Sequence, residues 1–273
     1  LSIGGGWLIA RDSFLPLERI TEAAGSISDG DDLSARLDLR RGPREMRRLA
    51  RTFDGMFARL ETSFLSKKQF TADASHELRT PVAVILAECD RARRKAETKE
   101  DFLASINVIE QQGNKMNTLI EQLLSLTRIQ QGTEKYPLRV CDLSGFVDAC
   151  CDEFVPVDER GMTLETDIEP GVAAAYNPSL LSRAMFNLMQ NAYKYGREGG
   201  NIRVSLCREN GCAVISVKDD GPGIPKAEQE KIWQRFYRCD ASRAEGGTGL
   251  GLSLVREIAL VHHARAEVVS EPG

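Results

Sequence analysis

Apolar residues recur at helical spacing through the first half of the chain. Those within residues 17–27 are spaced 3-4-3, and those within residues 46–60 are spaced 3-4-3-4. Both spacings keep one face of a helix apolar, as coiled coils do. The sequence therefore predicts two short coiled-coil helices, separated by the polar connector SDGDDLSARLDLRRGP.

Two further apolar stripes predict a helical hairpin. The first is a seam from residue 74 to residue 85, and the second is a heptad pattern from residue 102 to residue 127. Thr98 with Asp101 offers an N-cap for the second helix. A single hairpin would leave the wide second stripe half exposed, whereas two copies forming a four-helix bundle would bury it. We therefore expect a homodimer.

Beyond Tyr136 the pattern changes to strands mixed with helices, which predicts an α/β module and a domain boundary near 131–135. Strands are predicted at 137–141, 162–168, 201–208, 212–218 and 264–270. Helices are predicted at 143–154, 178–195, 226–234 and 250–263. Asn210-Gly211 is a hairpin-turn pair between the third and fourth strands.

Composition excludes some functional classes. The 273 residues carry a formal net charge of −4, which argues against a nucleic-acid binder because no basic domain is available to neutralise phosphates. The seven cysteines form no C-x-x-C pair, and this fits a reducing cytoplasm. Adjacent Cys150 and Cys151 are interpreted as two small apolar residues on a half-buried helix rather than as a redox sensor.

The first residues and the arginines that follow bear on a membrane. LSIGGGWLIA, with Trp7, ends at Arg11 and has the pattern of the cytoplasmic end of a transmembrane helix, although composition equally allows a Gly-rich tail. No run of eighteen apolar residues is present. Arginines are dense from Arg36 to Arg51, which suits either contact with anionic lipid or a solvated face.

His76 is the first candidate for chemistry. It lies two positions from both Ala74 and Leu78, so at about 100° per residue it points roughly opposite the seam, toward solvent. Thr80 lies one turn later on the same face, and Glu77 is placed to take a proton from the imidazole. Pro81 is expected to kink or loosen the helix. The turn suits a phosphoryl acceptor.

A polar strip predicts where a nucleotide binds. Asn187 and Asn191 are four residues apart, so both amides project from one helical face, which Lys194 and Tyr195 continue. The oxygen of an Asn side chain is a neutral hard ligand that suits Mg²⁺ carrying phosphates. On a helix alone, however, two asparagines are more often capping or surface groups.

Two glycine-rich segments complete the candidate site. In DDGPGIP, Asp219 follows a strand and can accept from an exocyclic amino group, while Gly221 and Gly223 allow the backbone to approach a purine ring. GGTGLGL opens a helix whose amides suit a di- or triphosphate. Arg235 or Arg238 could stabilise the negative charge of a phosphoryl group while it is transferred.

Taken together, these strings resemble sensor histidine kinases. SHELRTP resembles their H-box, and NLMQNAYKYG, DDGPGIP, IWQRFYRCD and GGTGLGL resemble the N, G1, F and G2 boxes of the Bergerat ATP-binding fold. The two heptad helices with their connector resemble a HAMP module. The resemblance implies an end of a transmembrane helix at 1–10, a HAMP-like linker at 11–64, a dimeric helical-hairpin four-helix bundle at 65–132, and an α/β sandwich at 133–273 whose last strand is expected to be truncated.

The resemblance also implies roles and partners. ATP and Mg²⁺ are the expected cofactors, with Asn191 as the metal ligand and Asp219 as the reader of adenine. His76 would be phosphorylated and would pass the phosphate to an aspartate on the receiver domain of a response regulator. Thr80 completes the H-E-x-x-T pattern that accompanies phosphatase activity toward that regulator. The remaining nucleotide contacts are expected at Asn187, Lys194, Tyr195, Gly221, Gly223, Ile224, Gly247, Thr248, Gly249, Leu250 and Gly251.

The chain would then be the cytoplasmic portion of an inner-membrane protein, attached through a preceding transmembrane segment. Two alternatives remain open at this point. One is a dimeric signalling scaffold whose nucleotide module no longer transfers phosphate. The other is a gyrase- or chaperone-like ATPase. The mobile lid expected over ATP lies between Tyr237 and Gly246 and contains Arg238, Ser242 and Arg243.

Overall fold

The computed structural model describes residues 34, 36–39, 44–95, 98–130, 136–154, 160–239 and 247–271. Contacts divide the chain into two compact units, Leu1–His76 and Glu77–Gly273, and each is described by itself. The predicted helix at 17–27 and residues 240–245 of the predicted lid lie outside the described residues. In the described part of the chain, no helix is long and apolar enough to cross a membrane.

Helix α2, Arg44–Lys95, joins the predicted helix at 46–60 to the helix that carries His76. It continues through Pro81, so the expected loosening does not end the helix. Near its start, buried Ala50 and Phe57 pack on buried Leu37, with Leu39 and Phe53 beside them. This small core holds the connector residues 37–39 against the helix.

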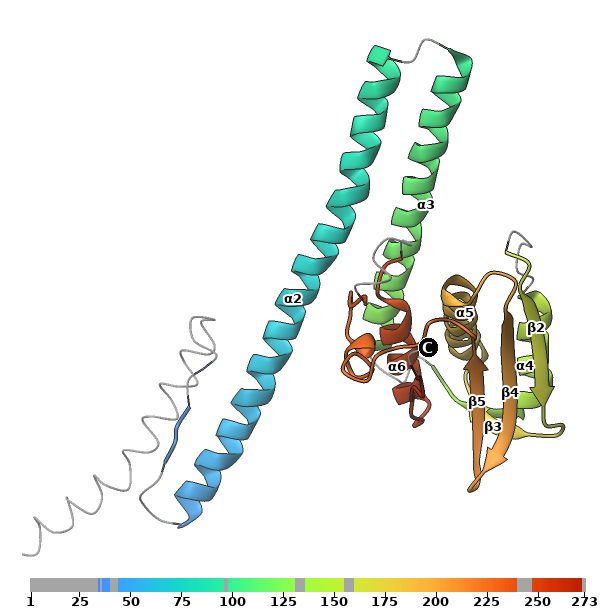
Figure 1. Cartoon of the computed structure of the whole chain (residues 1–273). Coiled ribbons are helices and arrows are strands. Elements are labelled where there is room, and N and C mark those ends of the chain that lie inside the picture. The colour runs from blue at the N-terminus through green and yellow to red at the C-terminus, as the bar shows by residue number, and fades with distance from the viewer. Residues whose placement is uncertain are drawn as a thin grey trace, which may run out of the picture. The chain divides into compact units, whose positions relative to one another are not determined.

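Helix α3, Lys99–Gln130, begins with the predicted cap. The Asp101 amide donates to Thr98 Oγ1 at 3.2 Å, and the Thr98 amide donates back to Asp101 Oδ2 at 3.2 Å. Figure 1 shows α3 beside the C-terminal part of α2, where Arg91 of α2 donates to Ser105 of α3 at 3.1 Å. The predicted hairpin is confirmed.

The apolar stripes of the hairpin are only partly buried within one chain, as predicted for the stripe of the second helix. Leu78 and Ile85 are half buried, and Val82 is 40% exposed. On α3, Phe102 is 46% exposed and Ile106 is 54% exposed. Side chains of this kind gain free energy by leaving water, so the stripe can still be covered by another apolar surface.

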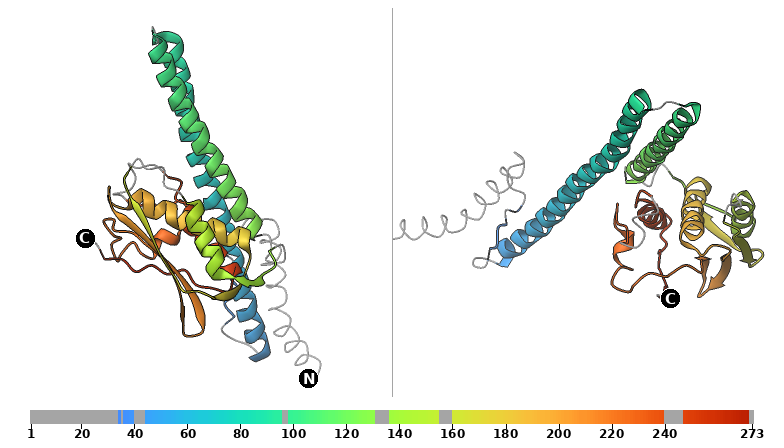
Figure 2. Two further views of the ribbon diagram at one scale, coloured as in Figure 1. Left: turned by 90° about the vertical axis from the view of Figure 1, so that its right-hand side faces the viewer. Right: turned by 45° about the horizontal axis from the view of Figure 1, so that its top comes forward.

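The rest of the second unit is a two-layer α/β module. Its elements in chain order are β1 Arg139–Asp142, α4 Leu143–Glu153, β2 Thr163–Ile168, β3 Ala173–Tyr176, α5 Pro178–Tyr195, β4 Asn201–Glu209, β5 Cys212–Lys218, η2 Lys231–Trp233 and α6 Gly251–Val261. The main sheet has the order β2-β4-β5, with β2 parallel and β5 antiparallel to β4, and β1 pairs with β3 separately. Helices α4 and α5 cover one face of the main sheet (Figures 1 and 2).

The core lies between these helices and the sheet. Val147 of α4, Met189 of α5 and Val204 of β4 are completely buried in it. Cys150 and Cys151 belong to the same cluster, as predicted, and burial with the neighbouring Cys150 raises the pKa of the Cys151 thiol to about 11. These thiols therefore pack as apolar groups and are not poised as thiolates.

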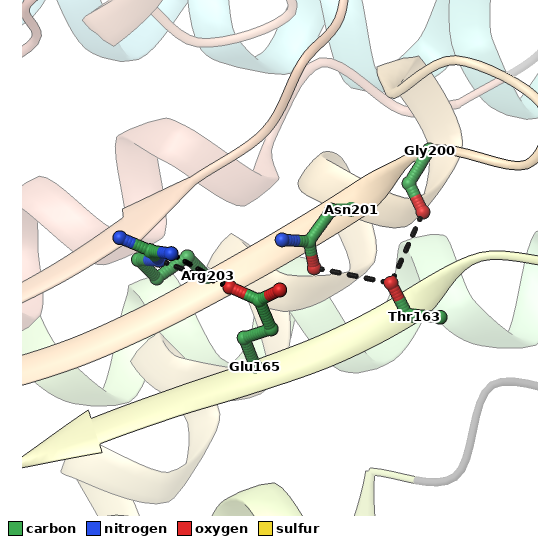
Figure 3. Close-up of polar contacts among 5 residues, drawn as sticks. All are labelled: Thr163, Glu165, Gly200, Asn201 and Arg203. Carbon is green, nitrogen blue, oxygen red and sulfur yellow. Dashed lines mark hydrogen bonds and ion pairs between the residues drawn. The ribbon is translucent and has the colours of Figure 1, made fainter.

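The opposite face of the sheet is polar, as Figure 3 shows for β2 and β4. Paired Thr163 and Asn201 share a hydrogen bond of 3.2 Å, and Arg203 donates to its partner Glu165 at 2.7 Å. The Arg203 guanidinium lowers the pKa of the Glu165 carboxyl. One face is therefore covered by helices and the other is solvated.

Two predicted elements differ from the structure, and one observed strand was not predicted. Residues 264–270 join no ladder in the described part of the chain, and Val269 is 97% exposed. A strand needs a neighbour to pair with, and here Ser270 instead accepts from the Ile224 amide at 2.8 Å. The predicted helix at 226–234 is only the short η2, because so few residues rarely nucleate an α-helix. Strand β3 was not predicted, because AAAY has little strand propensity of its own.

Candidate functional site

Helix α5 is the scaffold of the candidate site, and its local sequence explains its bounds. Asn177 caps it by accepting from the Leu180 amide at 3.2 Å, and Pro178 is its first residue. Met185 and Met189 are buried in the core. Asn187 and Asn191 each lie about 200° farther round the helix, half buried, on the face away from that core.

The start of α6 lies against this strip. A Cβ added to Gly251 would lie 2.9 Å from Asn187 Oδ1 and 3.9 Å from Asn191 Nδ2. A Cβ on Gly247 would lie 2.7 Å from Lys194 Nζ, which donates to the Tyr195 hydroxyl at 2.8 Å. The fold thus brings the glycine-rich segment and the polar strip together, although about sixty residues separate them in the sequence.

The loop after β5 packs on the end of α5. The Gly221 amide donates to Asp219 Oδ1 at 2.9 Å, and a Cβ on Gly221 would overlap the carbonyl of Tyr195. Only glycine permits this approach. The Asp219 side chain is exposed at the mouth of the loop, while the Ile224 amide is held by Ser270. Asp219 can therefore accept a hydrogen bond from a ligand.

Asp220 was not singled out from the sequence, yet it fixes this loop. Its carboxylate accepts from the Arg197 amide and the Asn201 amide, each at 3.1 Å. These two donors, Arg197 foremost, lower the pKa of the Asp220 carboxyl. A Cβ on Gly200 would overlap the carboxylate. Asp220 thus ties the segment after α5 to the residue beside Asp219.

Arg160 was also missed. Its guanidinium donates to the carbonyls of Tyr193 and Lys194, at 2.5 and 2.7 Å, and to that of Gly196 at 2.9 Å. Helix ends leave such carbonyls without helical partners. Gly196 has φ −63° and does not form a left-handed cap, so another donor is needed. No sequence motif identifies Arg160. The only signal for such a residue is that the last carbonyls of α5 lack donors within the helix.

The remaining predicted contacts have varied surroundings. Thr248 Oγ1 donates to Gln122 Oε1 of α3 at 2.5 Å, a partner that no sequence pattern indicates. Leu250 is completely buried, so only its backbone is available to a ligand. The Arg235 guanidinium pairs with Glu257 of α6 at 3.0 Å. Figure 1 shows α6 close to the end of α3.

Two more predicted residues belong to the same segments. Gly223 has φ +74°, and Gly249 has φ +68° with its Cα against the backbone of Phe236. A side chain at either position would be strained. Arg238 is half buried between these segments in the sequence.

The candidate phosphoacceptor residues lie on α2. His76 and Thr80 are both exposed, as the helical spacing predicted, and Glu77 is half buried. Within the residues that the structure describes, no group of three or more His, Cys, Asp or Glu side chains could hold a metal ion.

Three regions of the chain match known families. Residues 8–62 match the HAMP domain, residues 66–132 match the His Kinase A (phospho-acceptor) domain, and residues 176–273 match the histidine kinase-, DNA gyrase B- and HSP90-like ATPases. The last of these contains α5, the Asp219 loop and the glycine-rich segment. Members of that ATPase family bind ATP.

Similar proteins cover most of the chain. The chain is 36% identical over 216 residues to sensor histidine kinase RppB of Synechocystis, which is 77% of this chain and 48% of that protein. It is 33% identical over 269 residues to the histidine-protein kinase/phosphatase MprB of Mycobacterium, which is 96% of this chain and 51% of that protein. The chain thus spans about half the length of these relatives.

One solved structure shares the fold over most of the chain. It is histidine kinase ThkA in complex with the response regulator TrrA, at 23% identity and a TM-score of 0.60. The match covers 76% of this chain and 57% of that one. It supports the architecture of a long helical hairpin followed by an α/β ATPase module.

Proposed function

The chain belongs to the sensor histidine kinases, with HAMP, His Kinase A and ATPase regions in that order, and on this premise we propose that it phosphorylates its own His76 from ATP. The phosphate then passes to an aspartate on the receiver domain of a response regulator. The observation that carries the proposal is the meeting of the glycine-rich segment with Asn187, Asn191 and Lys194.

The donors in the site fit a magnesium nucleotide. Asn191, with Asn187 beside it, offers amide oxygens to Mg²⁺, which keeps most of its waters and needs few protein ligands. Lys194 and the amides of residues 247–251 offer positive charge to phosphate. Asp219 accepts from the exocyclic amino group of adenine. When bound, Mg²⁺ would neutralise charge that develops on the phosphates.

The transfer needs few side chains. A ring nitrogen of His76 attacks the γ-phosphorus, the bond from that phosphorus to the oxygen of ADP breaks, and the imidazole proton passes to Glu77.

Because both His76 and Thr80 are exposed, a docked protein can reach either. We assign Thr80 to the reverse reaction, in which its hydroxyl orients a water toward the acyl phosphate of the regulator. MprB, which is named a kinase/phosphatase, supports this assignment. Decay of the phosphorylated regulator with Thr80→Ala protein tests it.

We further propose a homodimer formed through the hairpin. Val82, Phe102 and Ile106 are 40%, 46% and 54% exposed and leave an apolar stripe uncovered. A second copy of the chain supplies a matching surface for this stripe.

We place the domain limits at 1–10, 11–64, 65–132 and 133–273, and we place the protein at the cytoplasmic side of an inner membrane. The match of residues 8–62 to the HAMP domain supports attachment to a membrane through a preceding transmembrane segment.

The decisive experiment is incubation with γ-labelled ATP. We expect an acid-labile, alkali-stable label on the wild-type chain and none on His76→Gln. His263→Asn is the matched control, because His263 is also exposed and its φ of +53° suits asparagine. Label that persists on His76→Gln contradicts the assignment. Free phosphate released equally by both variants, without label, indicates an ATPase instead.

A further inference from the structure

The first turns of α2 carry arginines on one face. Arg44, Arg47, Arg48 and Arg51 follow the spacing i, i+3, i+4, i+7, and Arg59 lies two turns later. At about 100° per residue, all five fall within roughly 120° of the helix surface. Each is exposed. The helix therefore presents a continuous cationic stripe, which we call the arginine face.

The acidic side chains of the same stretch lie elsewhere. Asp54 accepts from the Leu37 amide at 2.7 Å and the Asp38 amide at 3.3 Å, and Glu61 pairs with Arg36. Both acids face the connector, and Glu45 lies about 100° from Arg44, outside the stripe. At the same 100° per residue, Asp54 and Glu61 lie about 20° and 40° beyond one edge of the stripe, and Glu45 lies about 40° beyond the other edge. The acids therefore flank the arginine face without entering it.

The arginines keep their charge unneutralised by neighbours. The Arg51 Nε donates to the carbonyl of Arg47 at 3.3 Å, and Arg59 Nε donates to that of Gly55 at 3.2 Å. Among the described residues, Arg44, Arg47 and Arg48 form no ion pair. Guanidinium groups in this position retain most of their donors for an external anion.

We propose that the arginine face binds the phosphate headgroups of an anionic phospholipid membrane. A protein partner normally needs an apolar or aromatic anchor. The positions that fall within the arginine face hold Gly55 and Ala58, whereas the exposed side chains of Leu49, Met56 and Leu60 lie about 60–100° beyond its edge. An array of phosphates needs only cations with forked donors. The proposal rests on the membrane attachment proposed above, and it adds the surface by which the region after that attachment contacts lipid.

The dimensions suit a surface contact. Arg44 and Arg51 are seven residues apart, which is about 10 Å along the helix axis. That length is close to the Debye length of about 8–10 Å at physiological salt. All four leading arginines therefore feel the potential of the membrane even when the helix stands upright on it.

The test is sedimentation of the whole chain with vesicles. One set contains phosphatidylcholine alone, and the other contains equal parts phosphatidylcholine and phosphatidylglycerol. We expect the anionic vesicles to bind the chain more tightly, with an affinity that falls as salt rises. Replacing Arg44, Arg47, Arg48 and Arg51 by Gln is expected to weaken that binding about a hundredfold.

The control removes the same charge from other exposed sites. It replaces by Gln the exposed arginines Arg93, Arg139, Arg256 and Arg265. We expect it to bind anionic vesicles as the wild type does. Equal weakening by both variants, or equal binding of the wild type to both kinds of vesicle, overturns the proposal. Salt-sensitive binding to polyglutamate but not to anionic vesicles assigns the face to an acidic protein and also overturns it.

Labelling of His76 separates this inference from the function on which it rests. The Arg44/Arg47/Arg48/Arg51 variant is expected to keep its label in the absence of lipid, which also shows that its nucleotide module is folded. A wild type that binds anionic vesicles without taking label retains the lipid surface and loses the proposed kinase activity. A wild type that takes label but shows no preference for anionic vesicles retains the proposed kinase activity and lacks the lipid surface.

Discussion

The surroundings of α5 and the seam of the hairpin are built in opposite ways. Around α5, backbone groups are held by side chains from distant segments of the same chain: Arg160 donates to the last carbonyls of the helix, and Asp220 accepts from the Arg197 and Asn201 amides. Along α2 and α3, the apolar side chains are only partly covered within one chain, and Ile106 is 54% exposed.

The two regions therefore differ in which contacts fix their geometry. The hydrogen bonds that hold the proposed nucleotide site all come from the same chain, and most come from the α/β module itself. The hairpin leaves apolar side chains exposed, so we expect association with a second surface to stabilise it. Substitutions in the two regions should therefore fail in different assays.

The largest effect is expected from a charge placed in the hairpin stripe. Ile106→Glu would bury an unpaired carboxylate in each half of a dimer, so its dissociation constant should rise about a thousandfold. Sedimentation equilibrium measures this, and affinity for ATP should not change. Leu260→Glu is the control, since Leu260 is 61% exposed on α6. If the control dissociates the dimer and Ile106→Glu does not, the hairpin is not the interface.

Asn191→Asp should give the converse result. It changes the charge of the proposed metal ligand and leaves the hairpin untouched, so labelling with γ-labelled ATP should fall a few hundredfold while the dimer persists. Gln190→Glu, at an exposed neighbouring position, adds the same charge and should label normally. Undiminished labelling of Asn191→Asp would remove the Mg²⁺ role.

Arg160→Ala tests whether the hydrogen bonds from Arg160 to the carbonyls at the end of α5 matter for the candidate site. Loss of three donated bonds should cost about 1.5–3 kcal/mol of unfolding free energy and weaken ATP binding about tenfold, as seen by calorimetry. Arg160→Lys should recover part of both effects, because a lysine can still donate to these carbonyls. Arg197→Ala, which leaves the backbone amide in place, is the control. A stability loss without any change in ATP affinity would make Arg160 purely structural.

The smallest expected effect is a dependence on pH. The carboxyl of Asp220 has its pKa lowered from an ordinary 3.8, so its bonds stabilise the fold above that pH, and the gain is lost as pH falls through the lowered value. Asp220→Asn should therefore unfold more easily than the wild type near neutrality, and the difference should shrink in acid. Thermal unfolding across that range measures it.

Local sequence determined much of this protein. Helix α5 has the predicted bounds, because Asn177, Pro178 and the spacing of Met185 and Met189 all act within the segment. The cap of α3 and the Asn210-Gly211 turn between β4 and β5 are local in the same sense. The motifs also indicated the residues that the fold brings together, since glycines and asparagines are restricted by backbone geometry and side-chain length.

Only the tertiary structure decided the rest, because those features depend on partners far along the chain. AAAY becomes β3 because β1 pairs with it, whereas residues 264–270 have strand-like alternation but find no strand to pair with in the described part of the chain. Arg160 and Asp220 acquire their roles from carbonyls and amides more than eighteen residues away. Hydrogen-bonding groups exposed by one segment are satisfied by another, and a sequence pattern does not show which.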